Sequence, residues 1–196
     1  MSHTLACEAS DLFAGTAPVS FGISGGSSPA AIVENCRSTM TRGIDVIHFH
    51  GTADSTVDYD NGVLDSLGAP DSLAAWRQIQ AASTTSTTTN PSSNTSCRTH
   101  AGGRDGARVS LCTATGGNHN LYPDVNGAGI PTIAWSFFEA RAGGTPPDNP
   151  TPSPTVVLFE SFDNGLGRLT GPAVRRRGRT ACACAAAALR TRSAQV

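Results

Sequence analysis

The apolar positions along residues 1–142 alternate between the spacing of helices and the spacing of strands. Apolar residues three or four apart predict helices, and short β-branched or aromatic runs predict strands. The predicted helices cover residues 2–13, 29–35, 73–82 and 129–142, and the predicted strands cover residues 16–20, 44–50 and 107–114. Strands that alternate with helices are typical of a parallel sheet with right-handed crossovers. The pattern therefore predicts an α/β fold, with a parallel sheet and flanking helices.

The run Ile44–His50 gives the clearest strand signal, because it is β-branched and aromatic and is closed by Gly51. Ser28 followed by Pro29 is a typical start for the helix that comes after it. Residues 83–96, in contrast, are almost all Ser, Thr and Asn. A stretch this polar contributes little to a core, and we predict that it is a surface loop.

A proline-rich stretch separates this α/β region from the rest of the chain. Residues 143–155 contain five prolines, a composition typical of a stiff, extended linker. The apolar run at 156–163 resembles the opening strand of an appended β-module of the carbohydrate-binding kind. We therefore predict an α/β region at 1–142, a Pro-rich linker at 143–155 and, at 156–196, the stub of a β-module followed by a short, disordered, basic tail.

The charge of the chain is unevenly distributed. Seven Arg and two acidic residues follow residue 155, whereas residues 1–150 hold seven Arg and thirteen acidic residues, so that the net charge of -1 is a cancellation. One interpretation of the tail is a basic segment that binds anions. All fourteen basic residues are Arg and none is Lys, which suggests GC-rich coding DNA. An out-of-frame translation of such DNA is the interpretation that we favour after about residue 168.

Composition excludes several classes of protein. Charged residues make up 15% of the chain and apolar residues 38%, a balance unlike that of an intrinsically disordered protein. The small net charge gives no general attraction to nucleic acid or anionic lipid. No stretch approaches the ~18 to 20 apolar residues of a membrane span. We expect no nucleic-acid partner, no membrane partner and no cofactor.

Four cysteines in the α/β region, Cys7, Cys36, Cys97 and Cys112, suit an oxidising compartment. Residues 1–8, however, lack the basic and apolar regions of a signal peptide. Two explanations stay open, namely a cytosolic protein with free thiols and a secreted protein whose true N-terminus is missing. If disulfides form, we expect Cys97 to pair with Cys112, around a loop of about 15 residues, and Cys7 to pair with Cys36.

Two candidate catalytic residues each follow a predicted strand. Asp54 lies just after the strand that ends at His50, and His119 lies in the segment 116–123 after the strand at 107–114. Open α/β sheets place functional groups at the carboxyl ends of their strands. Taken separately, an aspartate here more often makes an Asx turn, and a histidine here more often lies on the surface. Together, their order fits the Ser–Asp–His chain order of α/β-hydrolases, with the histidine as general base.

Two further motifs point to weaker hypotheses. Gly22–Gly26 matches G-x-S-x-G with Ser24 as the serine. A nucleophile elbow needs a strand directly before its serine and a helix that starts almost at it, whereas the next predicted helix begins near Pro29, so Ser24 is a minor alternative. His48 and His50 share one face of their strand and could in principle bind a metal. No third ligand has a suggestive spacing, and we expect no metal.

Three blocks of sequence carry a resemblance to a known family. They are Met1–Val19, with Leu5-Ala6-Cys7 and Ala17-Pro18-Val19, then Ile47–Asp54, and finally Gly116–His119 continued by Tyr122-Pro123 and Trp135–Phe138. In these blocks the chain resembles the secreted polyhydroxybutyrate depolymerase and feruloyl esterase-type α/β-hydrolases. The resemblance covers residues 1 to about 142. It implies a partial α/β-hydrolase fold, of which this chain holds the C-terminal part.

The resemblance also implies roles for individual residues. Asp54 would orient His119 and stabilise its imidazolium, and His119 would act as general base and then as general acid in acyl transfer by a Ser-His-Asp triad. Asn118 departs from the small residue that we expect before this histidine. In the register of the resemblance, the nucleophilic serine and the oxyanion loop lie upstream of Met1. We therefore expect the chain as written to be inactive as an esterase.

The resemblance further implies a secreted protein whose signal peptide is missing together with the N-terminus. We expect a monomer that acts on a polymeric ester substrate, either a polyester or a feruloylated polysaccharide. Two alternatives stay open. One is a non-catalytic secreted protein that binds polysaccharide, and the other is a cytosolic hydrolase with free thiols that uses Ser24.

Overall fold

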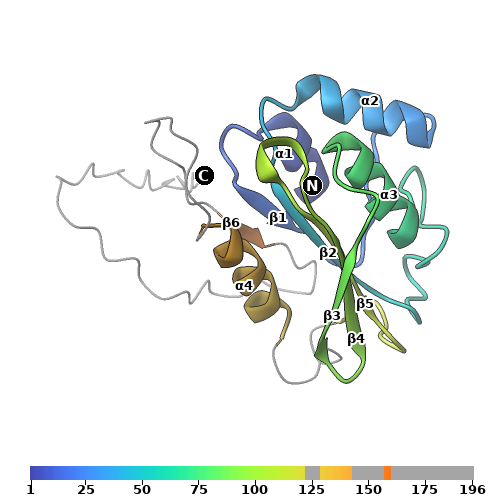
Figure 1. Ribbon diagram of the computed structural model, residues 1–196. Coiled ribbons are helices and arrows are strands. Elements are labelled where there is room, and N and C mark those ends of the chain that lie inside the picture. Colours follow the sequence, from blue (N-terminus) through green and yellow to red (C-terminus); the bar gives the residue numbers. More distant parts are fainter. Residues whose placement is uncertain (122–128, 143–156, 160–196) are drawn as a thin grey trace, which may run out of the picture. The chain divides into compact units, whose positions relative to one another are not determined.

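The computed structural model describes residues 1–121, 129–142 and 157–159. These residues form one mixed β-sheet with helices on both faces, as Figure 1 shows. In chain order the elements are α1 (Ser2–Glu8), β1 (Gly15–Ala17), α2 (Pro29–Thr39), β2 (Asp45–Gly51), α3 (Ala69–Ile79), β3 (Thr87–Ser92), β4 (Thr95–His100), the 3-10 helix η1 (Arg104–Gly106), β5 (Val109–Ala114), α4 (Ile130–Ala142) and β6 (Val157–Phe159). The strand order is β3-β4-β5-β2-β1-β6. An α/β fold is confirmed, and its assignment to the α/β-hydrolases in particular stays a prediction.

The three strands predicted from the apolar pattern form the parallel centre of the sheet. β2 lies between β1 and β5, and both neighbours run parallel to it. All seven residues of β2 are buried, so its polar residues Asp45, His48 and His50 lie inside the protein. Because the three strands run in the same direction, their carboxyl ends meet at one edge of the sheet.

Buried Asp45, at the start of β2, is held by two arginines. Oδ1 accepts a hydrogen bond from the backbone N–H of Arg108 at 2.9 Å and lies 3.0 Å from Nη1 of Arg141. Oδ2 accepts from the Arg108 guanidinium, with Nε at 3.1 Å. A buried carboxylate needs such partners, because leaving it unpaired costs far more than an ion pair gains. These contacts join the starts of β2 and β5 to α4, at the end of the sheet opposite to the candidate residues.

The helices differ from their predicted bounds mainly at their ends. α1 is shorter than predicted and stops at Glu8, α2 continues to Thr39, and α3 is shifted towards the N-terminus and begins at Ala69. Ser28 caps α2 as predicted, since its Oγ accepts the backbone N–H of Ala31 at 3.2 Å. Apolar spacing shows which face of a helix is buried, but it contains little information about where the last turn ends.

The prediction of a surface loop at 83–96 is wrong for most of that stretch. β3 and β4 form an antiparallel hairpin, and β4 also pairs antiparallel with β5. The sheet is therefore mixed, not purely parallel. Threonine is β-branched and suits an extended backbone, and the four residues Thr87–Asn90 at the start of β3 are exposed. An edge strand with both faces in water needs no apolar alternation, which is why the pattern did not reveal it.

β6 extends the sheet beside β1, because Val157–Phe159 pairs in parallel with Gly15–Ala17. These three residues belong to the run at 156–163 that was expected to open a β-module. The expected linker at 143–155 lies outside the described residues. So does the chain after residue 159, which contains the two remaining cysteines, Cys182 and Cys184. The domain boundaries proposed from the sequence stay a prediction.

Two apolar clusters lie on opposite faces of the sheet. Val46 belongs to the cluster beneath α1, α2 and α3, which contains the buried Trp76, whereas Ile47 and Phe49 belong to the cluster beneath α4. Because side chains alternate along a strand, His48 faces the same side as Val46. Among the residues that the structure describes, no helix is long and apolar enough to cross a membrane.

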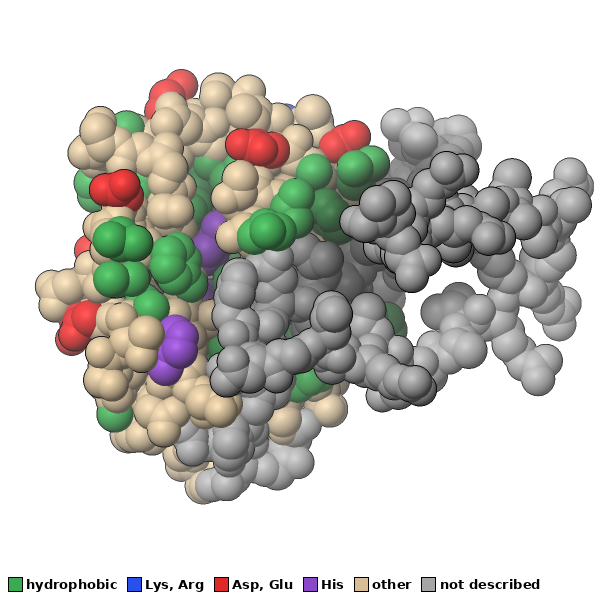
Figure 2. All heavy atoms as spheres, turned by 180° about the vertical axis from the view of Figure 1, so that it is seen from behind, with side chains coloured by type: hydrophobic (Ala, Val, Ile, Leu, Met, Phe, Trp, Pro, Cys, Tyr) green, Lys and Arg blue, Asp and Glu red, His purple; other side chains and the backbone are tan. Residues whose placement is uncertain are grey.

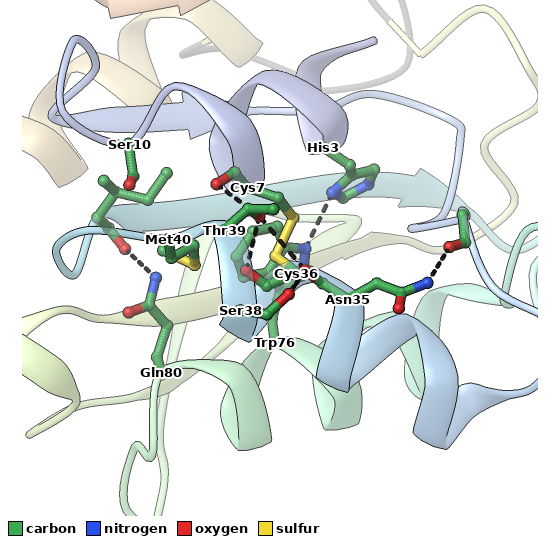
Figure 3. The surroundings of a disulfide bond; sticks show 12 residues. His3, Cys7, Ser10, Asn35, Cys36, Ser38, Thr39, Met40, Trp76 and Gln80 are labelled. Atoms are coloured by element: carbon green, nitrogen blue, oxygen red, sulfur yellow. Dashed lines mark hydrogen bonds between the residues drawn. A yellow bond between two sulfur atoms is a disulfide. The ribbon is translucent and has the colours of Figure 1, made fainter.

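Both predicted disulfides are present. Cys7–Cys36 joins α1 to α2, as Figure 3 shows. Cys97–Cys112 joins β4 to β5 at directly opposed positions of the antiparallel pair, with a Cα–Cα distance of 3.9 Å. Disulfides persist in oxidising compartments, so both bonds fit an extracellular protein.

We predict that removing the hairpin disulfide with the double substitution Cys97→Ala/Cys112→Ala lowers the free energy of unfolding by about 3 kcal/mol, because the unfolded chain regains the freedom of a loop of about 15 residues. Equilibrium unfolding in urea measures the change. Cys182→Ala/Cys184→Ala is the matched control, since it also removes two cysteines but leaves both disulfides intact. Equal unfolding midpoints for the two double variants would contradict the prediction.

Candidate active site

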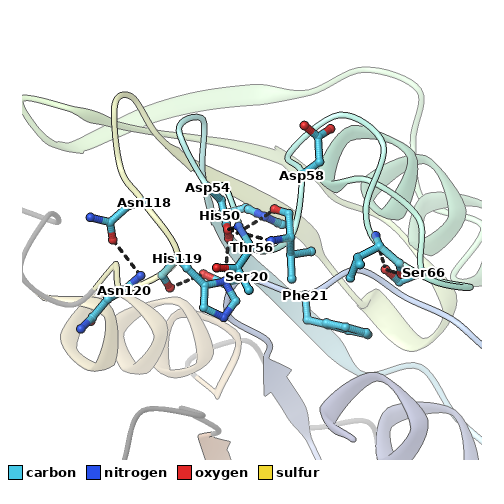
Figure 4. A network of polar contacts seen from close by, with 12 residues as sticks. Ser20, Phe21, His50, Asp54, Thr56, Asp58, Ser66, Asn118, His119 and Asn120 are labelled. Carbon is cyan, nitrogen blue, oxygen red and sulfur yellow. Dashed lines mark hydrogen bonds and ion pairs between the residues drawn. The ribbon is translucent and has the colours of Figure 1, made fainter.

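The structure brings Asp54 and His119 into direct contact. They lie in the loops that follow the neighbouring parallel strands β2 and β5, at the same edge of the sheet (Figure 4). His119 Nδ1 lies 2.9 Å from Asp54 Oδ2. The contact joins residues that are 65 positions apart. The order of the two residues along the chain and the direction of their strands were sufficient to suggest this pair.

The Asp54 carboxylate is oriented by its own loop. Oδ1 accepts the backbone N–H groups of Thr56 at 2.9 Å and Val57 at 2.8 Å. This is the Asx turn that was the alternative interpretation of the residue. The turn occupies one carboxylate oxygen and leaves Oδ2 for His119. The two interpretations of Asp54 are therefore compatible.

The two loops are also joined through their backbones. The N–H of Ala53 donates to the carbonyl oxygen of Gly117 at 2.9 Å, and the Gly116 N–H donates to Thr52 Oγ1 at 2.9 Å. Gly51 permits this close approach, because a Cβ at that position would lie 2.2 Å from the Gly117 carbonyl oxygen. The distance between Asp54 and His119 thus depends on backbone contacts as well as on their side chains.

The two side chains differ in exposure in a way that suits proton transfer. The Asp54 side chain is 0% exposed and that of His119 is 36% exposed. A carboxylate only accepts hydrogen bonds, so Nδ1 of neutral His119 carries the proton and Nε2 keeps the lone pair. Nε2 is therefore the atom that can take up a proton from a reacting group.

His119 is also the only histidine of the chain that is not buried, since the other four are. Figure 2 shows a face of the molecule on which histidine side chains are visible among hydrophobic side chains, with acidic side chains farther out.

A comparison with known proteins finds similarity to an esterase. The chain is similar to feruloyl esterase B from Piromyces equi. The two sequences are 25% identical over an alignment of 127 positions, and the match covers 61% of this chain and 22% of that relative. The chain therefore spans about a fifth of the length of the curated relative that it matches. No family model matches. The similarity indicates an esterase family in general and not one particular family.

Ser24, the serine of the G-x-S-x-G match, is not part of the Asp54–His119 contact. It is exposed, in the loop between β1 and α2, and no strand comes directly before it. Its neighbour Ile23 is tied to α3 through the hydroxyl of Ser72 at 3.1 Å. Within the described residues, no contact joins Ser24 to either candidate residue.

Sequence reasoning missed two residues that contact the pair. His50 Nε2 lies 3.3 Å from Asp54 Oδ2. The sequence analysis considered this histidine only in the minor hypothesis of a metal site. Ser20 donates from Oγ to the backbone carbonyl oxygen of His119 at 3.0 Å, and its φ of 53° is unusual for a residue other than glycine. The spacing of four residues between His50 and Asp54 was a usable signal. Nothing in the sequence indicates the contact of Ser20.

Two further buried histidines, His3 and His48, lie next to one another, with ring centroids 5.6 Å apart. His3 accepts from Trp76 Nε1 at 2.9 Å and donates from Nε2 to the Phe21 carbonyl oxygen at 3.0 Å, and burial lowers the pKa of His3 to about 4. Burial also lowers the pKa of His48 well below its ordinary value. Within the described part of the chain, no group of three His, Cys, Asp or Glu residues could hold a metal ion.

Proposed function

We propose that this chain carries the acid and the base of a serine carboxylic ester hydrolase. The observation that supports the proposal is the 2.9 Å contact between the His119 imidazole and the buried Asp54 carboxylate, at the carboxyl edge of parallel strands. The similarity to feruloyl esterase B supports an esterase class. By the family resemblance, the reaction is acyl transfer through a covalent intermediate.

In this mechanism His119 transfers protons and Asp54 stabilises the charge. A serine Oγ attacks the ester carbonyl carbon while its proton moves to His119 Nε2, and Asp54 stabilises the imidazolium through the proton on Nδ1. When the tetrahedral intermediate collapses, the alcohol leaves with the proton from Nε2. A water molecule then attacks the acyl-enzyme by the same route, which releases the acid and regenerates the serine.

Following the register of the family resemblance, we place the nucleophilic serine in a part of the protein that precedes Met1. The proposed substrate is a polymeric ester, either a polyester or a feruloylated polysaccharide, and the similarity to a feruloyl esterase favours the second. We further propose that the protein is secreted, an inference supported by its two disulfides.

The proposal predicts a large difference between the 196-residue protein and an extended protein translated from in-frame coding DNA upstream of Met1. The extended protein should hydrolyse methyl ferulate or p-nitrophenyl acetate. The 196-residue protein should be about 10⁶-fold slower in kcat, because it lacks the nucleophile. Spectrophotometric rates for both proteins measure the ratio.

A serine-reactive phosphonate identifies the nucleophile directly. Peptide mapping should find the adduct on a serine before Met1, and Ser24→Ala should leave both labelling and rate unchanged. An active 196-residue protein that loses its activity on Ser24→Ala would show that Ser24 is the nucleophile. An in-frame stop codon just before Met1 would also overturn the placement of the serine.

A further inference from the structure

The Asp54 carboxylate faces a second imidazole besides that of His119. His50 Nε2 lies 3.3 Å from Asp54 Oδ2 and 3.0 Å from the carbonyl oxygen of Val57. The His50 side chain is fully buried, near the end of β2. Figure 4 shows His50 and His119 both reaching the carboxylate.

The contacts of His50 determine which nitrogen carries its proton. Carbonyl and carboxylate oxygens only accept hydrogen bonds, so Nε2 must be the donor. Nδ1 is buried and has no hydrogen-bond partner among the described residues. The imidazole ring of His50 lies next to the rings of His48 and Tyr59, with centroids 5.3 Å and 5.6 Å away. A second proton on Nδ1 would place an unpaired N–H of a cation in the interior, and burial correspondingly lowers the pKa of His50.

We propose that His50 is a positioning residue, which shares its Nε2 proton between Asp54 Oδ2 and the Val57 carbonyl oxygen and thereby holds the carboxylate towards His119. This inference rests on the proposed function of the pair. With it, Asp54 has four donors, namely the N–H groups of Thr56 and Val57 on Oδ1 and the two imidazoles on Oδ2. A carboxylate offers about four acceptor sites, so this arrangement leaves little freedom to rotate.

The same proton also ties the end of β2 to the loop that carries Asp54. Val57 is the residue whose N–H holds Oδ1 and whose carbonyl oxygen accepts from His50. A side chain without a donor at position 50 would leave the Val57 carbonyl oxygen unpaired and Oδ2 with one donor fewer. Misplacing a catalytic group by about 1 Å can cost about 10²-fold in rate.

The kinetic test compares two substitutions at position 50 in the extended protein. His50→Leu removes the donor, and we expect kcat to fall by about 10²-fold with little change in KM. His50→Gln places an amide N–H near the position of Nε2, and we expect it to recover at least about tenfold of that loss, because one donor to Oδ2 or to Val57 is restored.

His48→Leu is the matched control for this experiment. His48 is buried on the same face of β2, its ring lies against that of His50, and it has no contact with Asp54 among the described residues. We expect His48→Leu to keep the rate of the unmodified enzyme. Equal losses for His48→Leu and His50→Leu, or a glutamine variant no faster than the leucine variant, would show a purely structural role and overturn the inference.

A spectroscopic test does not depend on enzymatic activity. In ¹⁵N NMR spectra of the 196-residue protein, His50 should be neutral, with its proton on Nε2 and a bare Nδ1. The His119 Nδ1 proton should exchange faster with water in His50→Leu than in His50→Gln. A proton on His50 Nδ1 with a bare Nε2 would overturn the inference. If these spectra are as expected but the extended protein hydrolyses no ester, the proposed function fails and the positioning contact stands.

Discussion

Replacing His119 with alanine in the extended protein is expected to lower kcat about 10⁶-fold, with KM for the ester nearly unchanged. In a Ser-His-Asp enzyme, loss of the histidine alone costs about as much as loss of the whole triad, because the serine is then never deprotonated. His119 Nδ1 already faces Asp54 in this structure. The proposal therefore leaves only Nε2 to accept the proton of the serine.

The measurement is the steady-state rate of methyl ferulate hydrolysis, with and without added imidazole. The His119 side chain is 36% exposed, so free imidazole can reach the space that the substitution opens and should restore part of the rate. His100→Gln is the control, because His100 lies on β4 and contacts the carbonyl oxygens of Ser83 and Thr85 instead of the site. A loss smaller than about tenfold for His119→Ala would exclude His119 as the general base.

Replacing Asp54 with asparagine is expected to lower kcat about 10⁴-fold. The asparagine oxygen can keep the turn contacts to Thr56 and Val57. Its NH₂ group then takes the place of Oδ2 and can only donate. His119 must turn its lone pair towards that group, so the proton moves to Nε2 and the imidazole can no longer act as a base.

The controls for this substitution separate chemistry from stability. Asp58→Asn is the matched control, because exposed Asp58 also accepts backbone N–H groups on Oδ1, from Asp60 and Asn61, but does not contact His119. We expect it to retain full activity. His50 Nε2 also lies 3.3 Å from Oδ2, and an asparagine NH₂ at this place would face the N–H that we propose for it, so Asp54→Asn should destabilise the fold by about 1 to 3 kcal/mol, which urea unfolding measures. Activity close to that of the unmodified enzyme, in a folded Asp54→Asn protein, would remove Asp54 from the mechanism.

Most of the central sheet could be predicted from the sequence, whereas its edge could not. Ile44–His50 and 107–114 were identifiable as strands because buried strands concentrate β-branched and apolar residues. β3 was not, because its side chains are polar and its first four residues are exposed. β4 alternates between buried and exposed residues in part, but its buried members are Thr95, Cys97 and His100, and hydropathy alone does not mark a buried threonine or histidine as a core residue.

Part of the candidate site could likewise be predicted from the sequence, and part of it could not. Asp54 and His119 were predictable because each follows a parallel strand, and parallel strands end at the same edge. The distance between them was not predictable, since it depends on how Gly51 and Gly117 pack against one another. The contact of Ser20 with the His119 carbonyl oxygen joins residues 99 positions apart, and no sequence pattern indicates it.

By itself, the sequence determined the alternation of strands and helices in the centre of the fold and the two residues placed at strand ends. These features are encoded in period, order and residue type, which are local properties of a chain. Only the tertiary structure decided that the threonine-rich stretch forms a hairpin at the sheet edge and that His50 Nε2 lies 3.3 Å from the Asp54 carboxylate. The physical reason is that the partner of a polar group is chosen by distance and direction in the folded state, and spacing along the chain limits that choice without making it.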